Sequence, residues 1–370
     1  MRIDANEAGL AVTTDGASAV LEWSWIADHC DDVGSVDADT RQRRRNTYGN
    51  EVVARPELAQ GDQQIDFVWA DGTESSISMD LLASVLPTRH VGVPRPLVAG
   101  LGLDNDITLW HTGDQAAPPS FVASEIVGDE AVRQQFVNAI WRWGVVTIEQ
   151  CEAGRAQVES LAGAIGYVRR TIFGGVWELA AEVTDHRDSA YTKVHLGMHT
   201  DGTYMHDAPG LQLFVCQERD GTGGESVIAD GFAAAARLAD DDPEGAALLA
   251  GVSVPGHYVE PGVDLRAERP VIATDSAGRI TQFSLNNYDR SPFYLGPADR
   301  PFRAAYSAIS ADIEQAQCWH RISWKPGRAM IINNWRVLHG RTAFTGSRRF
   351  LGAYLNHEDL ESVRRVFANG

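Results

Sequence analysis

From about residue 190 onward, short apolar segments alternate with turns that contain Gly or Pro. Segments of this length, bounded by turn-forming residues, are typical of strands that repeatedly reverse direction. Two helical segments, near 232–239 and 302–316, interrupt the pattern. The pattern therefore favours a β-sandwich or β-barrel. The predicted strands are 211–216, 225–231, 280–285, 320–327, 329–335 and 350–355.

Helical patterns precede this strand-rich region. Residues 130–144 place apolar side chains at helical spacing and end at Gly144, and residues 145–149 form an apolar run typical of a buried strand. The helical pattern returns in 155–166. We therefore expect a mainly β domain with some α content at residues 118–370.

The first 90 residues predict a separate, small β-rich domain. Its short apolar segments, at 19–26, 64–79 and 81–86, are separated in places by DG turns. A stretch rich in Pro and Gly follows. The predicted organisation is an N-terminal domain at 1–90, a linker at 91–117 and the large domain at 118–370.

The formal net charge of −18 argues against nucleic acid or an anionic membrane as the main partner, because both require a basic surface. A small cationic or zwitterionic substrate is compatible with this charge. One basic cluster, Arg41 to Arg45, follows an acidic stretch, and we interpret it as a solvated loop rather than a nucleic-acid patch.

The sequence also bears on the compartment. It contains neither a run of about 18 apolar residues nor the basic and then apolar start of a signal peptide. The widely separated cysteines, without a CxxC pair, are typical of reduced thiols. We expect a cytoplasmic protein, and a homodimer stays open. The cysteines are Cys30, Cys151, Cys216 and Cys318.

A candidate metal site begins at His199 and Asp201, which are two residues apart. On an extended strand, both side chains would leave the same face. A distal histidine, His339, comes directly after a predicted strand. Two imidazoles and one carboxylate leave coordination positions open, as non-haem Fe(II) oxygenases require. An HxD tripeptide alone also occurs by chance, so further residues are needed.

Two such residues stand at the starts of predicted strands. Arg348 follows the distal histidine, and its guanidinium could bind a carboxylate of 2-oxoglutarate in a bidentate fork. Ser226 could add a hydroxyl to the same carboxylate. The alternative for Arg348 is an ordinary surface arginine, which is how we interpret its neighbour Arg349.

At these motifs, the chain resembles the trimethyllysine dioxygenase and γ-butyrobetaine dioxygenase family, which belongs to the taurine dioxygenase-like enzymes. The resemblance spans about residues 170–365 and extends weakly toward the N-terminus. It is carried by DSAYTK, HTDGTYMHDAPGLQLFVC, GTGGESVIADGF, LNNYDR and KPGRAMIINNWRVLHGRTAFTGSRRFLGAYL.

The resemblance implies a double-stranded β-helix (jelly-roll) core, with Fe(II) bound by His199, Asp201 and His339. It implies 2-oxoglutarate bound by Arg348, with O₂ as the second cosubstrate. No catalytic residue beyond the metal ligands is expected.

The same resemblance implies a substrate pocket of aromatic rings around a trimethylammonium group, a cation that has no hydrogen to donate. Matching positions are Trp177, Tyr191 and Tyr354. Phe173 and Asn287 are expected in the same substrate pocket. Phe173 and Gly202 stand where the butyrobetaine enzyme supplies tyrosines, whereas the segment with Asn287 is nearer the trimethyllysine enzyme. The alternative is that these aromatic side chains are ordinary core residues.

The butyrobetaine relative also holds a structural zinc in its N-terminal domain. Of that cluster, this chain keeps Cys30 beside His29 and has Ser35 at a later cysteine position. Because a closed zinc site needs four ligands, we do not expect zinc here.

The preferred hypothesis is an enzyme of the EC 1.14.11 type. It would hydroxylate a small amino acid-like or quaternary ammonium substrate, trimethyllysine-like or betaine-like, and release succinate and CO₂, in a role like carnitine biosynthesis. An alternative is an oxygenase acting on another amino acid or small metabolite in a specialised pathway. A third hypothesis, a non-catalytic binding protein of the same fold, is disfavoured because the triad and Arg348 are intact.

Overall fold

The structure is a computed structural model of the whole chain. It describes residues 1–14, 17–44, 53–86, 103–111, 117–180, 193–315 and 320–369. In this part of the chain, no helix is long and apolar enough to cross a membrane. Cys30, Cys151 and Cys216 are buried free thiols, and Cys318 lies outside the described residues.

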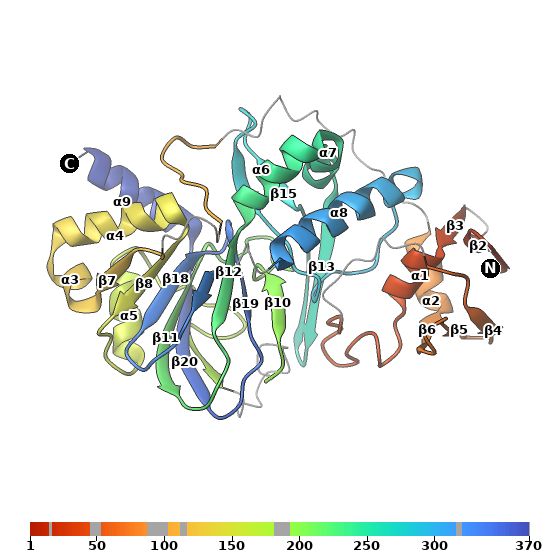
Figure 1. Cartoon of the computed structure of the whole chain (residues 1–370), viewed down its shortest axis with the longest axis horizontal. Coiled ribbons are helices and arrows are strands. Elements are labelled where there is room, and N and C mark those ends of the chain that lie inside the picture. Colours follow the sequence, from red (N-terminus) through yellow and green to blue (C-terminus); the bar gives the residue numbers. More distant parts are fainter. Residues whose placement is uncertain are drawn as a thin grey trace.

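The larger of two central sheets has six strands, antiparallel except for the parallel pair formed by its first two (Figure 1). In spatial order they are β7 (Ser120–Val122), β8 (Val145–Glu149), β18 (Ala329–Asn333), β11 (Leu211–Arg219), β20 (Arg348–Leu355) and β9 (Val176–Ala180).

The second sheet has four antiparallel strands, two of which contribute the histidines discussed below. In spatial order they are β10 (Leu196–His199), β19 (Val337–Arg341), β12 (Ser226–Asp230) and β17 (His320–Ile322).

An inner core fills the space between the two sheets. Phe214 of β11 and Phe350 of β20 meet Ile228 of β12 in this core. Alternate residues of β11, such as Leu213, instead pack with the helices on the outer face of the six-stranded sheet. Because strand side chains alternate between faces, one apolar strand serves both cores.

Helices cover both outer faces (Figure 1). The helices α3 (Ala123–Gly128), α4 (Glu130–Trp143), α5 (Arg155–Gly163) and α9 (His357–Asn369) pack on the six-stranded sheet. The helices α6 (Gly231–Asp241), α7 (Pro243–Gly251) and α8 (Asp299–Glu314) pack on the four-stranded sheet, and η3 (Gly296–Ala298) precedes α8.

Between α7 and α8 the chain forms two hairpins. They consist of β13 (Ser253–Glu260) with β14 (Val263–Pro270), and β15 (Ile272–Thr274) with β16 (Ile280–Phe283).

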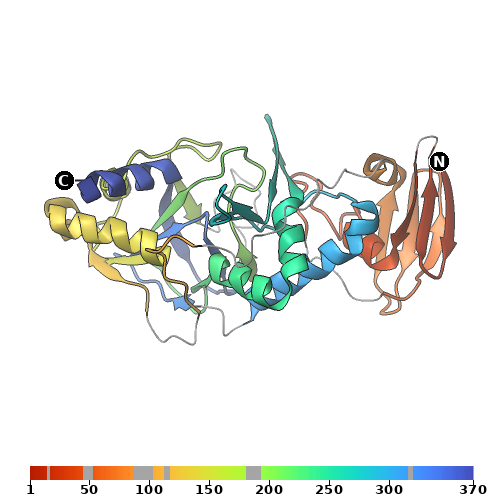
Figure 2. The ribbon, with the colours of Figure 1, turned by 90° about the horizontal axis from the view of Figure 1, so that it is seen from above.

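An N-terminal module, residues 1–86, has its own core around Trp25 and Phe67. It lies at the opposite end of the molecule from α9 (Figures 1 and 2). Its elements are β1 (Arg2–Asn6), β2 (Gly9–Thr13), β3 (Ser18–Glu22), α1 (Trp23–His29), β4 (Glu57–Gln60), β5 (Gln64–Val68), β6 (Glu74–Ser78) and α2 (Met79–Val85).

Buried ion pairs join this module to the rest of the chain. The Arg303 guanidinium of α8 donates to Asp299 and to Glu22 of β3, at 2.7 Å in both cases. Asp28 of α1 lies 3.2 Å from Arg43 and 2.8 Å from Arg290. Burial would raise the pKa of Asp28, but the two guanidinium groups lower it to about 2.

Several sequence expectations are confirmed, and others are wrong. The helix predicted at 130–144 is α4, capped by the Asp129 carboxylate and ended by Gly144 at a φ of 73°. The apolar segment 81–86 lies largely in helix α2, which Ser78 caps, and is not a strand. The sequence analysis did not predict the β13–β14 hairpin or helices α7 and α9.

The solvated-loop interpretation of Arg41 to Arg45 is wrong in part. Gln42 and Arg43 are buried because they pair with Asp289 and Asp28. Arg45 and most of the predicted linker at 91–117 lie outside the described residues. Within the described part of that stretch, Trp110 is buried and its backbone N–H donates to Asp230.

Asp230 and Arg336 form a buried ion pair, at 2.6 Å, and Asp230 also caps α6. Asp230→Asn should lower the free energy of unfolding by about 3–5 kcal/mol, because it leaves a buried guanidinium without its counter-charge. Urea denaturation measures this loss. Asp264→Asn, which alters an exposed pair with Arg266, is the control and should leave the midpoint near wild type. Equal effects of the two variants would contradict this account.

Candidate active site

Two histidines lie side by side on neighbouring strands of the four-stranded sheet. His199 at the end of β10 pairs in register with His339 of β19, and their ring centroids are 4.4 Å apart. A bulge lies between Leu196 and His199, so both side chains line one cavity while Met198 points into the outer core. Such a bulge re-aims a side chain. His339 lies within β19 rather than directly after a strand, which corrects the sequence expectation.

Asp201 is not on an extended strand, because β10 ends at His199. A loop holds it instead. Its backbone N–H donates to the Asn334 side chain at 2.8 Å, and the Asn334 amide donates back to the Asp201 carbonyl at 3.0 Å. Gly202 follows with a φ of 74°, and a Cβ there would lie 2.6 Å from the Pro209 ring. This turn places the Asp201 carboxylate next to the imidazoles of His199 and His339.

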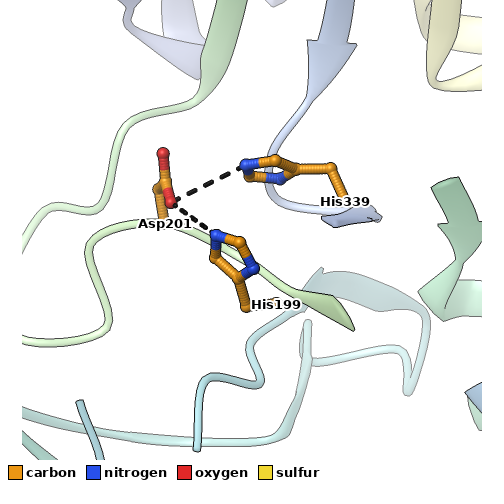
Figure 3. A group of neighbouring side chains, drawn as sticks. All are labelled: His199, Asp201 and His339. Carbon is orange, nitrogen blue, oxygen red and sulfur yellow. Dashed lines mark ion pairs between the residues drawn. The ribbon is translucent and has the colours of Figure 1, made fainter. Parts of the chain in front are cut away.

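The carboxylate of Asp201 divides its two oxygens between different tasks. Oδ2 accepts from Gln212 Nε2 at 2.7 Å and from the Tyr354 hydroxyl at 2.8 Å. Oδ1 lies 3.4 Å from His199 Nε2 and 3.8 Å from His339 Nε2 (Figure 3). One ligand atom from each of the three residues falls within 4.8 Å of the others, which is close enough for one metal ion.

The charges of these side chains are coupled. Burial alone would lower the pKa of His199, but Asp201, the Gly197 carbonyl and the more distant Asp289 carboxylate raise it. Burial and then repulsion by His199 lower the pKa of His339 to about 3, so this imidazole stays neutral. Burial would raise the pKa of Asp201, yet the imidazoles hold it well below its usual range. The site therefore presents an anionic carboxylate, as a metal requires.

A buried arginine faces the same cavity. Arg348 begins β20, as predicted, and is 7% exposed. Its guanidinium carbon lies 4.3 Å from the centre of the Phe350 ring. Burial, and then repulsion by Arg341, lower its pKa to about 9, which leaves it protonated at neutral pH. Its Nε lacks a hydrogen-bond partner, and no carboxylate of the described residues pairs with it. Arg348 is thus a buried cation suited to an anionic ligand.

Four other residues predicted from the sequence line this cavity: Ser226, Phe173, Trp177 and Tyr354. Ser226 lines the cavity, and its hydroxyl accepts from Trp324 Nε1 at 3.0 Å. Phe173, Trp177 and Tyr354 form an aromatic wall, where the Trp177 and Tyr354 rings are 5.5 Å apart.

Two predicted substrate-binding residues are not part of this wall. Tyr191 lies outside the described residues. Asn287 does not line the cavity, which corrects the sequence expectation: it is buried, and its Oδ1 accepts from Arg290 Nε at 3.3 Å.

The sequence reasoning missed several residues at the site. Gln212 is the one strongly polar residue in the apolar run 211–216, a signal that was available. Asn334 and Arg341 lie within the C-terminal motif that resembles the trimethyllysine dioxygenase family, but nothing in the sequence predicts their contacts. Gln42, from the N-terminal module, lines the cavity without any sequence signal.

Comparisons with known proteins identify the family of this chain. The profile of the taurine catabolism dioxygenase TauD, TfdA family matches residues 112–354. The chain is 28% identical to human mitochondrial trimethyllysine dioxygenase over 94% of this chain and 82% of that protein. It is 25% identical to human gamma-butyrobetaine dioxygenase over 69% of this chain and 68% of that protein.

A solved structure shares the fold. It is an asparagine oxygenase in complex with Fe(II), 3-hydroxyasparagine and succinate, with a TM-score of 0.50 and 13% identity over 61% of this chain and 80% of that chain. The family profile covers more than half of the sequence and includes His199, Asp201 and His339. The chain therefore belongs to the TauD, TfdA family of dioxygenases.

Proposed function

We propose that this protein is an Fe(II)- and 2-oxoglutarate-dependent oxygenase that hydroxylates a small quaternary ammonium substrate, trimethyllysine-like or betaine-like. One observation carries the proposal: two histidines and one aspartate converge on a cavity that also contains Arg348, a buried arginine that pairs with no carboxylate of the described residues. The human relatives at 28% and 25% identity, named for trimethyllysine and gamma-butyrobetaine, support the substrate class.

The donor set fits Fe(II). Two imidazoles and one carboxylate form the facial arrangement of non-haem iron oxygenases, which leaves positions open for a bidentate cosubstrate and O₂. The hydrogen bond between His199 Nδ1 and the Gly197 carbonyl, at 2.9 Å, leaves Nε2 as the ligand atom. Gln212 and Tyr354 hold Asp201 Oδ2, so that Oδ1 is presented to the metal.

Arg348 fits the distal carboxylate of 2-oxoglutarate. Its fork of N–H groups matches a carboxylate in geometry and charge, and burial strengthens the pairing. Ser226 lines the same cavity. When bound, iron would supply the chemistry in which O₂ oxidises both compounds: 2-oxoglutarate is converted to succinate and CO₂, and the substrate is hydroxylated.

The aromatic wall fits a trimethylated nitrogen. Such a cation has no N–H to donate, and the faces of aromatic rings attract it electrostatically, without a hydrogen bond. Gly352 lies beneath the Trp177 ring, where a Cβ would come within 2.1 Å of it. The glycine thus lets the Trp177 ring lie flat against β20.

The architecture proposed with this function is a double-stranded β-helix formed by the four- and six-stranded sheets, with residues 1–90 as a separate domain. The inner core between the sheets and the module's own core support this division. A cytoplasmic location, a linker at 91–117 and a homodimer stay predictions.

The first prediction tests the metal ligands. Alanine at His199, Asp201 or His339 should abolish succinate formation and weaken binding of Co(II), an Fe(II) substitute, while circular dichroism stays that of the folded protein. His257→Ala, at an exposed hairpin pair with Asp264, is the control. Full activity in any of the three ligand variants would contradict the assignment.

The second prediction tests the cosubstrate anchor. Arg348→Ala should raise the KM for 2-oxoglutarate on the order of a hundredfold, because charge-assisted bidentate bonds are worth a few kcal/mol. The KM for the prime substrate should change far less. Arg349→Ala is the matched control, since its exposed guanidinium pairs with Glu218. If the control variant showed the larger effect, Arg348 would not be the anchor.

The third prediction tests the aromatic wall. Trimethyllysine should exceed lysine by at least about tenfold in kcat/KM for substrate-driven succinate release, because the lysine ammonium would lose water and find no acceptor among ring faces. Trp177→Leu should reduce this preference. Equal turnover of the two amines, or of neither, would favour a different small metabolite as substrate.

A further inference from the structure

Among the described residues of the N-terminal module, Gln42 reaches the active-site cavity. Gln42 lines the same cavity as His199 and Arg348 and is 6% exposed. Its Nε2 donates to Asp289 Oδ1 at 3.0 Å, a contact between residues 247 positions apart in the sequence. A residue of the small module is therefore in a position to meet the substrate.

The segment that carries Gln42 is fixed at this place. The backbone N–H of Arg43 donates to the Tyr288 carbonyl at 2.8 Å. The Arg43 guanidinium shares the buried Asp28 carboxylate with Arg290. These contacts of Arg43 hold the backbone next to Gln42 beside the cavity.

Asp289 brings negative charge to the same part of the wall. It is 3% exposed and borders the cavity. Besides Gln42, its carboxylate accepts from Asn286 Nδ2 at 2.7 Å and from the Thr203 hydroxyl at 3.4 Å. Its charge also reaches the site, because it contributes to the raised pKa of His199.

The cavity wall is thus divided into three chemical regions. Arg348 and Arg341 form a cationic region that suits carboxylates, and Trp177 with its neighbours forms the aromatic region. The third region, formed by Gln42, Asn286 and Asp289, places two side-chain amides beside a carboxylate. It complements a group that is cationic and rich in N–H donors.

We propose that Gln42, together with Asp289, selects substrates that carry a free α-ammonium group. The inference rests on the proposed function and narrows it: the substrate is an amino acid rather than a betaine without the α-amino group. The N-terminal module is then part of the specificity site.

The test compares trimethyllysine with the same compound lacking its α-amino group. In wild type, kcat/KM for the amino acid should exceed that for the analogue by at least about tenfold. This is the change expected when the analogue loses one charge-assisted hydrogen bond. In Gln42→Leu, which keeps the size of the side chain but removes its amide, this preference should fall about tenfold. The KM for 2-oxoglutarate should stay close to wild type.

Two further variants separate specificity from folding. Arg44→Ala changes a half-exposed guanidinium beside Gln42 and Arg43 and should keep the wild-type preference. Asp289→Asn retains the shape of the side chain without its charge and should also reduce the preference. Thermal unfolding of each variant identifies any that fail to fold.

The outcomes are distinguishable. An unaltered preference in folded Gln42→Leu, or a wild-type preference below about threefold, would overturn this inference. An equal loss on both compounds would also overturn it and give Gln42 a structural role only. Failure of the protein to form an anaerobic charge-transfer band with Fe(II) and 2-oxoglutarate would instead contradict the proposed function itself.

Discussion

The site depends on the Asp201 carboxylate, which is held between two imidazoles in the space between two sheets. Removing such a carboxylate from water is costly unless every lone pair is satisfied. Here Gln212 and Tyr354 satisfy one oxygen, and the histidines face the other. The bulge in β10 and the turn at Gly202 follow from this requirement, because both bring the ligands onto one face.

Two other buried arginines have carboxylate partners. Arg336 pairs with Asp230, and Arg303 pairs with Asp299. Arg348 contrasts with them, since it is buried without a carboxylate among the described residues, beside a second arginine. A buried cation with no counter-ion destabilises a fold, so its presence beside the metal ligands is best understood as a site completed by an anionic cosubstrate.

Much of the site follows from the sequence, and the physical reasons for the rest are specific. Short apolar segments bounded by turns predicted β11, β18 and β20, and the HxD pair with a distal histidine predicted the cluster. No periodic rule foresees a bulge, so the conformation at Asp201 was predicted wrongly. The position of Gln42 at the cavity could not be predicted from the sequence, because it depends on long-range packing between the module and the segment near Asp289. Asn287 was misplaced because a loop side chain has no period from which to infer its direction.

The most direct test of the central claim is a calorimetric titration of the protein with 2-oxoglutarate under anaerobic conditions, with and without Fe(II). If one metal centre and Arg348 form a joint site, 2-oxoglutarate should bind with a stoichiometry of about one only when the metal is present, since each half of the ligand needs its own anchor. Binding of 2-oxoglutarate that does not depend on the metal, or metal binding without any binding of 2-oxoglutarate, would contradict the account.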